Sequence, residues 1–174
     1  MTTIAPPLSD EYGAAYARYV TRLPAGIDVL DLLASQQAST RARFAAVPAD
    51  RAGYRYAPGK WTVREVVMHL SDVERIMGYR ALRVARGDAT PLPGFDENAY
   101  ASLSNAEALP LSALAEEWGD VRRATVSLFR HFPPEAWTRR GTASGAPVSV
   151  RSLAWIIAGH EQHHLAVLAE RYGV

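Results

Sequence analysis

The amino-acid sequence predicts an all-α protein that folds as a four-helix bundle. Four stretches of about 20 residues carry apolar side chains spaced three and four apart, the period of a helix buried along one side. Prolines and glycines separate these stretches, and none of the chain has a convincing strand pattern. Four helices of similar length, each about 30 Å, are typical of a bundle, whereas a globin-like array has more helices of unequal length.

Length and composition indicate one globular domain. The chain has 174 residues, of which 48% are hydrophobic and 21% charged, which is ordinary for a domain with a sizeable core. We expect a single domain over residues 1–174, in which residues 1–23 form an N-terminal extension that holds a short helix. The formal net charge of +1 argues against nucleic acid and membrane partners. The partner that we expect is a small-molecule substrate.

The chain contains no cysteine. This excludes disulfides, zinc–thiolate sites and a cysteine nucleophile, and it fits a reducing compartment. The first residues lack the basic and apolar regions of a signal peptide, and the longest apolar run is too short to span a bilayer. We therefore expect a cytoplasmic protein.

The N-terminal part of the chain has clear helix signals. After a loose tail over residues 1–8, Ser9 is a candidate N-cap for a short helix. Pro24 suits the first turn of the first long helix, which extends to about residue 47 and is ended by Pro48. Residues 48–60 then form connecting chain with several helix breakers.

The second long helix is predicted over residues 62–86. Thr62 and Glu65 form a capping box, in which each side chain accepts a hydrogen bond from the backbone amide of the other residue. His69 lies in the middle of the apolar face of this helix, and Gly87 ends it. The long connection over residues 87–110 is of a length that is usually functional or crosses the end of a bundle.

Two further helices follow the connection. Ser112 is a candidate N-cap for the third long helix, which extends to about residue 131. A loop rich in glycine and serine over residues 139–148 leads to Ser149, a candidate N-cap for the last helix over residues 150–172. This last helix carries three of the five histidines of the chain.

His160 and His164 are four residues apart, so a helix presents both imidazoles on one face. Together with His69 on the facing second helix they form a set of three nitrogen ligands, the way in which bundles build metal sites. Neutral imidazoles suit zinc, nickel, copper and ferrous iron alike, so the residues alone do not select the metal. Three protein ligands leave coordination positions open, which is typical of catalytic rather than structural sites.

The stretch from His160 to His164 also matches H-E-x-x-H, the metalloprotease pattern. A third protease ligand comes from downstream of that pattern, and the short chain that follows His164 contains one carboxylate, Glu170. Glu161 lies about 100° around the helix from His160 and need not face the metal. We therefore disfavour a protease. We interpret Glu161 as a solvated residue or as a carboxylate that hydrogen-bonds to a ligand without binding the metal itself.

Three other residues near these ligands have open roles. His163 is a candidate for an acid or base at the edge of a pocket, with a surface histidine as the alternative. Asp72, one turn after His69, is a candidate second-shell carboxylate that could orient an imidazole, with an exposed acid as the alternative. His131 suits the C-terminus of the third helix electrostatically and has no expected catalytic role.

Three motifs resemble the DinB-like (DinB/YfiT) superfamily. They are the segment over residues 54–65 followed by His69 and Asp72, the Pro-Leu-Pro-Gly-Phe-Asp stretch over residues 91–96, and the Gly-His-Glu-Gln-His-His stretch over residues 159–164. The three motifs have the order and separation that the family shows, and the resemblance covers roughly residues 24–172. The resemblance implies a four-helix bundle with a long connection between helices two and three, and the ligands His69, His160 and His164. It further implies a homodimer and a bound divalent ion such as nickel or zinc.

The resemblance also implies an activity, since characterised members include metal-dependent transferases and isomerases that use a low-molecular-weight thiol such as bacillithiol or mycothiol. Our leading hypothesis is a metal-dependent hydrolase or thiol transferase. Because the chain has no cysteine, a reacting thiol would have to be a small-molecule cosubstrate. The alternatives are a non-catalytic metal- or ligand-binding bundle of the stress-protein type, and a bundle without metal.

Overall fold

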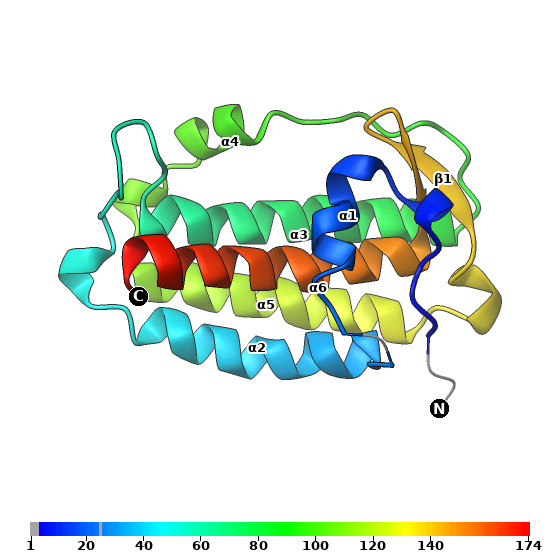
Figure 1. Ribbon diagram of the computed structural model, residues 1–174, viewed down its shortest axis with the longest axis horizontal. Helices are drawn as coiled ribbons and strands as arrows, with labels where there is room; N and C mark the ends of the chain where they lie inside the picture. Colours follow the sequence, from blue (N-terminus) through cyan, green and yellow to red (C-terminus); the bar gives the residue numbers. More distant parts are fainter. Residues whose placement is uncertain (1–3, 25) are drawn as a thin grey trace.

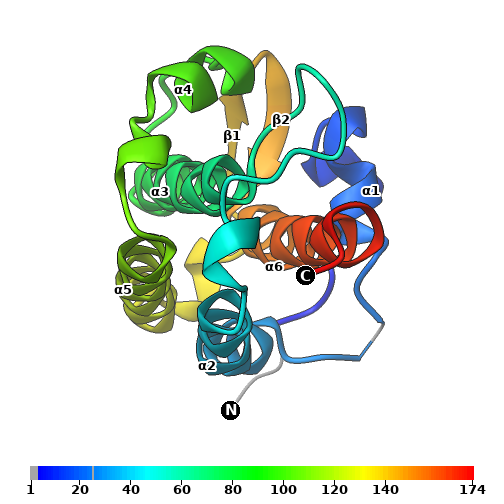
Figure 2. The ribbon, with the colours of Figure 1, turned by 90° about the vertical axis from the view of Figure 1, so that its left-hand side faces the viewer.

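The computed structural model describes residues 4–24 and 26–174 and confirms the four-helix bundle (Figures 1 and 2). The four long helices are α2 (Val29–Ala45), α3 (Val63–Ala85), α5 (Leu111–Arg130) and α6 (Val150–Val167). α6 continues as a π-helical turn, Leu168–Tyr172. The shorter elements are α1 (Ala17–Val20), α4 (Glu97–Leu103), β1 (Arg140–Ala143), β2 (Ala146–Ser149) and the 3₁₀ turns Ser9–Glu11, Ala14–Tyr16, Ala49–Arg51, Ala106–Ala108 and Pro134–Ala136. Among the described residues, no helix is long and apolar enough to cross a membrane.

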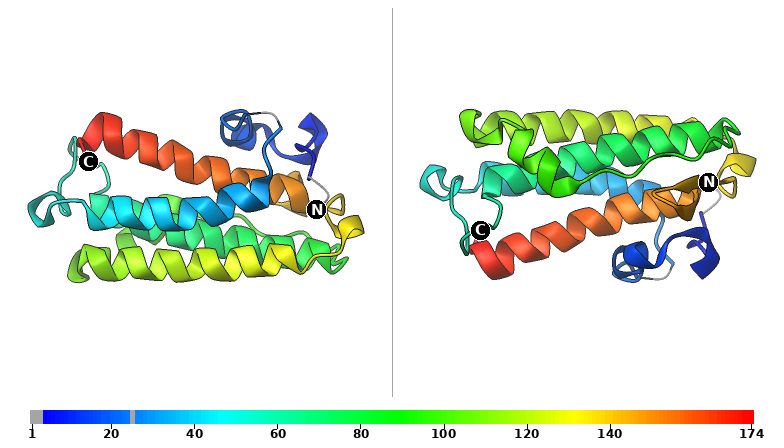
Figure 3. Two further views of the ribbon diagram at one scale, coloured as in Figure 1. Left: turned by 90° about the horizontal axis from the view of Figure 1, so that it is seen from below. Right: turned by 90° about the horizontal axis from the view of Figure 1, so that it is seen from above.

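The order of the helices explains the long connection. α3 and α5 run in the same direction, so the chain between them has to return along the whole bundle, and α4 lies on this return path (Figures 1 and 3). α3 packs against α5 and α6, and α2 packs against the same two helices from the other side. The predicted connection over residues 87–110 is therefore a strap along α3 that contains a helix of its own.

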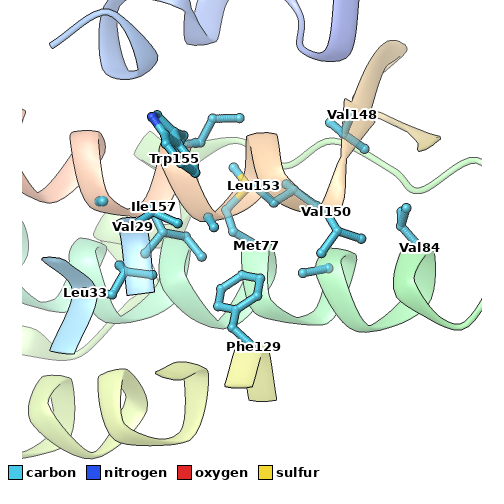
Figure 4. Close-up of a cluster of buried hydrophobic side chains, with 14 of the residues drawn as sticks. Val29, Leu33, Met77, Val84, Phe129, Val148, Val150, Leu153, Trp155 and Ile157 are labelled. Carbon is cyan, nitrogen blue, oxygen red and sulfur yellow. The ribbon is translucent and has the colours of Figure 1, made fainter. Parts of the chain in front are cut away.

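Two hydrophobic clusters fill the bundle. Figure 4 shows the larger one, where Leu33 from α2, Met77 from α3 and Phe129 from α5 point toward Leu153 and Ile157 from α6; all five are almost fully buried. The second cluster lies around Trp118 of α5 and includes residues of α2, α3 and the end of the chain. The apolar period read from the sequence is thus the buried face of each helix.

Two of the predicted caps are present. The Glu65 amide donates to the Thr62 hydroxyl over 3.1 Å and the Thr62 amide donates to the Glu65 carboxylate over 2.7 Å, so α3 begins where the capping box predicts. The Ser152 amide donates to the Ser149 hydroxyl over 3.0 Å at the start of α6. These caps determine where the first turns of the two histidine-bearing helices lie.

Two other helix starts were predicted wrongly. α2 begins at Val29 and not at Pro24, because the Asp28 carboxylate accepts from the Leu30 and Asp31 amides over 2.9 and 3.2 Å and caps the helix there. α5 begins at Leu111, with Pro110 in the N-cap position and no side-chain cap. Ser112 is therefore the second residue of the helix and not its N-cap.

The segment predicted as a loop over residues 139–148 contains a β-hairpin. β1 and β2 pair antiparallel, and Ser144 and Gly145 form the turn with φ of 53° and 73°. Two adjacent left-handed residues are what a two-residue hairpin turn requires, and the Ser-Gly pair was the signal that we missed. The Leu92 amide donates to Thr142 and the Ser144 amide to Leu92, so the hairpin also holds the strap.

The N-terminal extension is fastened to the start of α6. Ser9 is the first residue of a 3₁₀ turn and not the cap of an α-helix, and residues 1–3 of the predicted tail lie outside the described residues. Glu11 is buried, accepts from the Ser149 hydroxyl over 2.8 Å and pairs with the Arg151 guanidinium. Burial alone would raise the pKa of Glu11, but the hydrogen bonds from Arg151 and Ser149 outweigh burial and hold that pKa below its usual value.

A buried ion-pair network joins all four long helices. The Arg122 guanidinium of α5 donates to both carboxylate oxygens of Glu74 in α3 over 2.6 and 2.8 Å, and lies 2.7 Å from a carboxylate oxygen of Glu161 in α6. It also donates to the Leu33 carbonyl of α2 over 3.3 Å. Burial opposes the charge of Arg122, but the two carboxylates keep its pKa above the usual value.

Replacing Arg122 by Leu is expected to destabilise the protein by about 3–5 kcal/mol, because it leaves two buried carboxylates without a counter-charge. Urea unfolding followed by circular dichroism measures this loss. The neighbouring Arg123 is exposed, so Arg123→Leu is the matched control and should change the stability by no more than about 0.5 kcal/mol. Equal effects of the two variants would contradict the role given to the network.

The Glu11 contacts predict a specific pH dependence. Because the folded-state pKa of Glu11 lies below the unfolded value of 4.5, its contribution to stability is complete above that pH and is lost as the pH falls through the folded pKa. Thermal unfolding between pH 7 and pH 3 should therefore show a steeper loss of Tm on acidification for the wild type than for Glu11→Gln. Parallel curves for the two proteins would show that Glu11 does not contribute.

Candidate metal centre

Three histidines converge between α3 and α6. One ring nitrogen each from His69, His160 and His164 lies within 4.8 Å of the other two, and the Nε2 atoms of His69 and His160 are 3.1 Å apart. His160 and His164 are one turn apart on α6, with ring centroids separated by 4.5 Å. The facing helices and the i, i+4 spacing thus place all three imidazoles at one point, although 91 residues separate His69 from His160.

Burial keeps these imidazoles neutral. His69 and His160 are 5% and 6% exposed, whereas His164 is only half-buried. Loss of hydration lowers the pKa of His69 to about 4. Burial, followed by the proximity of the other histidines, holds the pKa values of His160 and His164 well below the usual range. At neutral pH each ring therefore has a free lone pair, which is the form that binds a metal.

The donor set fits a divalent transition metal. Two imidazole nitrogens bound to one zinc ion at tetrahedral angles are about 3.4 Å apart, given bonds of about 2.0–2.1 Å. The observed separations, 3.1 Å for one pair and no more than 4.8 Å for the others, are compatible with a shared ion. Within residues 4–24 and 26–174, no carboxylate or fourth histidine joins this group.

Two aromatic side chains border the histidines. The Trp61 ring lies against His69 with centroids 4.6 Å apart. Tyr19 of α1 is buried and meets the rings of His160 and His163 edge-on, at 5.1 and 5.5 Å. Neither residue was predicted from the sequence to lie beside the histidines. For Tyr19, the glycine before His160 could have indicated that another segment packs closely against α6 there.

Gly159 allows α1 to lie directly on α6. A Cβ atom at this position would be 2.1 Å from the carbonyl oxygen of Tyr19, so only a glycine permits such an approach. α1 packs against α6, and Figure 1 shows it lying across that helix. The missing side chain of Gly159 thus lets Tyr19 lie over the neighbouring His160.

The other candidate residues lie outside the group of three ligands. Asp72 is half-buried, which raises the pKa of its carboxyl, and its nearest charged partner is Arg75 at 3.9 Å. His163 is half-buried beside Tyr19, and burial followed by the charge of Arg18 lowers its pKa. His131 lies at the C-cap of α5, where helix electrostatics predicts it.

Glu161 is not solvated, and that interpretation was wrong. Its side chain is 1% exposed, pairs with Arg122 and accepts a hydrogen bond from the Thr40 hydroxyl. Burial raises the pKa of its carboxyl, although Arg122 opposes that rise. Its hydrogen bond and its ion pair are with α2 and α5, so this residue anchors α6 to those two helices.

The comparisons with known proteins agree with this geometry. A family model described as the DinB superfamily matches residues 32–168, which include all three histidines. The chain belongs to the DinB superfamily. The solved structure of YfiT from Bacillus subtilis, described as a probable metal-dependent hydrolase with an unusual four-helix bundle topology, has a TM-score of 0.71 and 20% identity, covering 83% of this chain and 86% of that one. The fold is therefore the DinB/YfiT-type bundle.

Two sequence relatives carry the name "Putative metal-dependent hydrolase". The protein from Bacillus pumilus is 26% identical over 98% of this chain and 95% of its own length. The protein from Oceanobacillus iheyensis is 29% identical over 64% of each chain, so that match spans less than two thirds of the relative. A mycothiol-dependent maleylpyruvate isomerase shares the fold with a TM-score of 0.66 at 17% identity, covering 95% of this chain and 62% of that one.

Gly159→Ala is expected to destabilise the protein by about 1–3 kcal/mol, because the added methyl group forces α1 away from α6. Alanine favours a helix over glycine by about 1 kcal/mol, so a loss here would be opposite to intrinsic propensity. Gly78→Ala in α3 is the matched control, since its Cβ would meet its nearest neighbour, Thr125, at an ordinary 3.8 Å. Urea unfolding of both variants checks the prediction, and similar changes in stability would contradict it.

Proposed function

We propose that this protein is a metal-dependent enzyme in which His69, His160 and His164 hold a divalent ion, with nickel or zinc favoured over iron or copper. The observation that carries the proposal is the convergence of three neutral imidazole nitrogens from two helices, one of them on a half-buried side chain. The absence of a fourth ligand from the described side chains supports a position open to small molecules. The names of the relatives support a hydrolase.

A bound ion of this kind supplies Lewis-acid chemistry, which lowers the pKa of a water or a small-molecule thiol and makes it a nucleophile at neutral pH. The chain itself contributes the surroundings. Trp61 and Tyr19 cover the rings of His69 and His160 and exclude water from them. The Tyr19 hydroxyl accepts a hydrogen bond from Arg18 over 2.8 Å, which orients it.

His163 is the proposed acid or base of the site. It lies next to His164 in the chain, with ring centroids 5.1 Å apart, but its nitrogens are not part of the ligand group. The nearby Arg18 and the partial burial lower its pKa, which favours the neutral form that can accept a proton. This role applies to a reaction with water and to a reaction with a thiol cosubstrate of low molecular weight.

His160→Ala is expected to lower the metal affinity by more than about 100-fold, because the loss of even an outer partner of a ligand costs about 10–100-fold. Elemental analysis of untagged protein, followed by metal titration, measures the change. His131→Ala is the matched control, because His131 lies at the end of α5 and should not affect bound metal. Unchanged metal content in His160→Ala would refute the ligand assignment.

The choice between a hydrolase and a thiol transferase is made by assaying the metal-loaded protein in two arms. One arm measures hydrolysis of a panel of esters and amides, and the other measures transfer of bacillithiol or mycothiol to an electrophile. Activity that appears with metal and disappears in His160→Ala supports the enzyme. A stoichiometric metal with no turnover in either arm would favour the non-catalytic metal-binding alternative.

A further inference from the structure

A second feature of the molecule is a cleft of about 290 Å³ between α3 and the strap over residues 87–110. Figures 1 and 3 show the strap and α4 following α3 along the bundle. Ile76, Tyr79 and Arg80 of α3 form one wall, and Phe95 and Tyr100 of the strap lie opposite. This volume is at the small end of the range of about 300–1,000 Å³ for small-molecule sites.

Arg80 is the unusual residue of this cleft. It is 1% exposed, yet no carboxylate within residues 4–24 and 26–174 forms an ion pair with it. Its guanidinium donates to neutral groups, the Pro93 carbonyl over 2.8 Å and the Ser144 hydroxyl over 2.9 Å, and more weakly to the Tyr16 hydroxyl over 3.4 Å. An arginine does not lose its proton in a protein, so this buried charge stays uncompensated.

The other arginine of the cleft shows the contrast. Arg75 is about half-exposed and pairs with Glu117 over 2.7 Å, so its charge is already balanced. None of the side chains that line the cleft is acidic. The only unbalanced charge that borders the cleft among the described residues is therefore the positive charge of Arg80.

The remaining lining specifies the rest of a ligand. Tyr79 and Tyr100 are 52% and 48% exposed, although they are large aromatic side chains. The centroid of the Phe95 ring, which belongs to the strap, lies 5.8 Å from the guanidinium carbon of Arg80. Exposed aromatic side chains around a concave surface are typical of binding sites for apolar groups. The cleft thus offers an aromatic rim and one buried cation.

We propose that this cleft binds a small organic carboxylate with an apolar or aromatic body, whose carboxylate pairs with Arg80 and whose body lies between Tyr79, Phe95 and Tyr100. A planar guanidinium matches a carboxylate in geometry, and such charged hydrogen bonds are the strong ones. Ile76 and Arg80 lie on the same side of α3 as His69, but seven and eleven residues farther along the helix. None of the three histidines lines the cleft, so the proposed site is separate from them and does not depend on a bound metal.

The test compares 4-phenylbutyrate with its neutral amide, 4-phenylbutanamide, as probes of the native protein. Binding is followed by ¹H–¹⁵N chemical-shift changes of assigned residues during titration. We expect the acid to bind at least about tenfold more tightly than the amide, with shifts centred on the cleft. The same preference is expected in His160→Ala, which excludes a carboxylate bound to the metal. Equal affinities for acid and amide, or shifts outside the cleft, would overturn the proposal.

Arg80 also holds the strap and the hairpin, so its charge is tested first with Arg80 in place and then by substitution of Arg80 itself. Ile76→Asp puts a carboxylate one turn from Arg80 and should abolish the preference for the acid. Ile76→Asn introduces a side chain of the same shape as Asp but without its charge, and should keep the preference. Ile76 is half-buried, which makes both variants tolerable to the fold. Arg80→Met should reduce binding of the acid to that of the amide. An acid preference that survives in both Ile76→Asp and Arg80→Met would show that Arg80 does not recognise the ligand.

Discussion

The bundle depends on the buried guanidinium of Arg122. It pairs with Glu74 on α3 and Glu161 on α6 and reaches the Leu33 carbonyl on α2, so one side chain of α5 contacts all three other long helices. Apolar packing alone permits neighbouring helices to slide by a turn, whereas this network has one register in which both carboxylates reach the guanidinium. His160 borders the same small space as Glu74, Arg122 and Glu161, so the register that satisfies the network also sets the position of His160 along the bundle axis.

The network also explains why Glu161, although it lies between His160 and His164 in the chain, is outside the group of three histidines. On a helix, the residue after His160 points to a different side, and here that side is the bundle core. The sequence alone presented an H-E-x-x-H pattern. That pattern does not show that Arg122, which lies 39 residues earlier in the chain, faces Glu161 in the folded bundle. A pairing between distant helices becomes visible only when the helices are packed, which is why the solvated interpretation of Glu161 was wrong.

Local signals, by contrast, were readable in advance. The capping box at Thr62 and the cap at Ser149 involve residues three apart, so the starts of α3 and α6 followed from spacing. The i, i+4 histidines followed from spacing as well, and a bundle brings them to the facing His69. The hairpin was missed because its strands are four residues each and owe their stability to the strap that Leu92 attaches to them. Its formation depends on tertiary contacts that no periodicity reports.

The N-terminal extension shows how the family and the individual chain contribute differently to the site. The family match begins at residue 32 and includes the three histidines, but α1 and Tyr19 precede it. Gly159 lies inside the match, and its missing side chain is what lets the Tyr19 carbonyl approach α6. Tyr19 then covers His160 and meets His163, the proposed acid or base. The part of the chain shared with the family therefore includes the three histidines, whereas the wall above them is argued from the contacts of this chain alone.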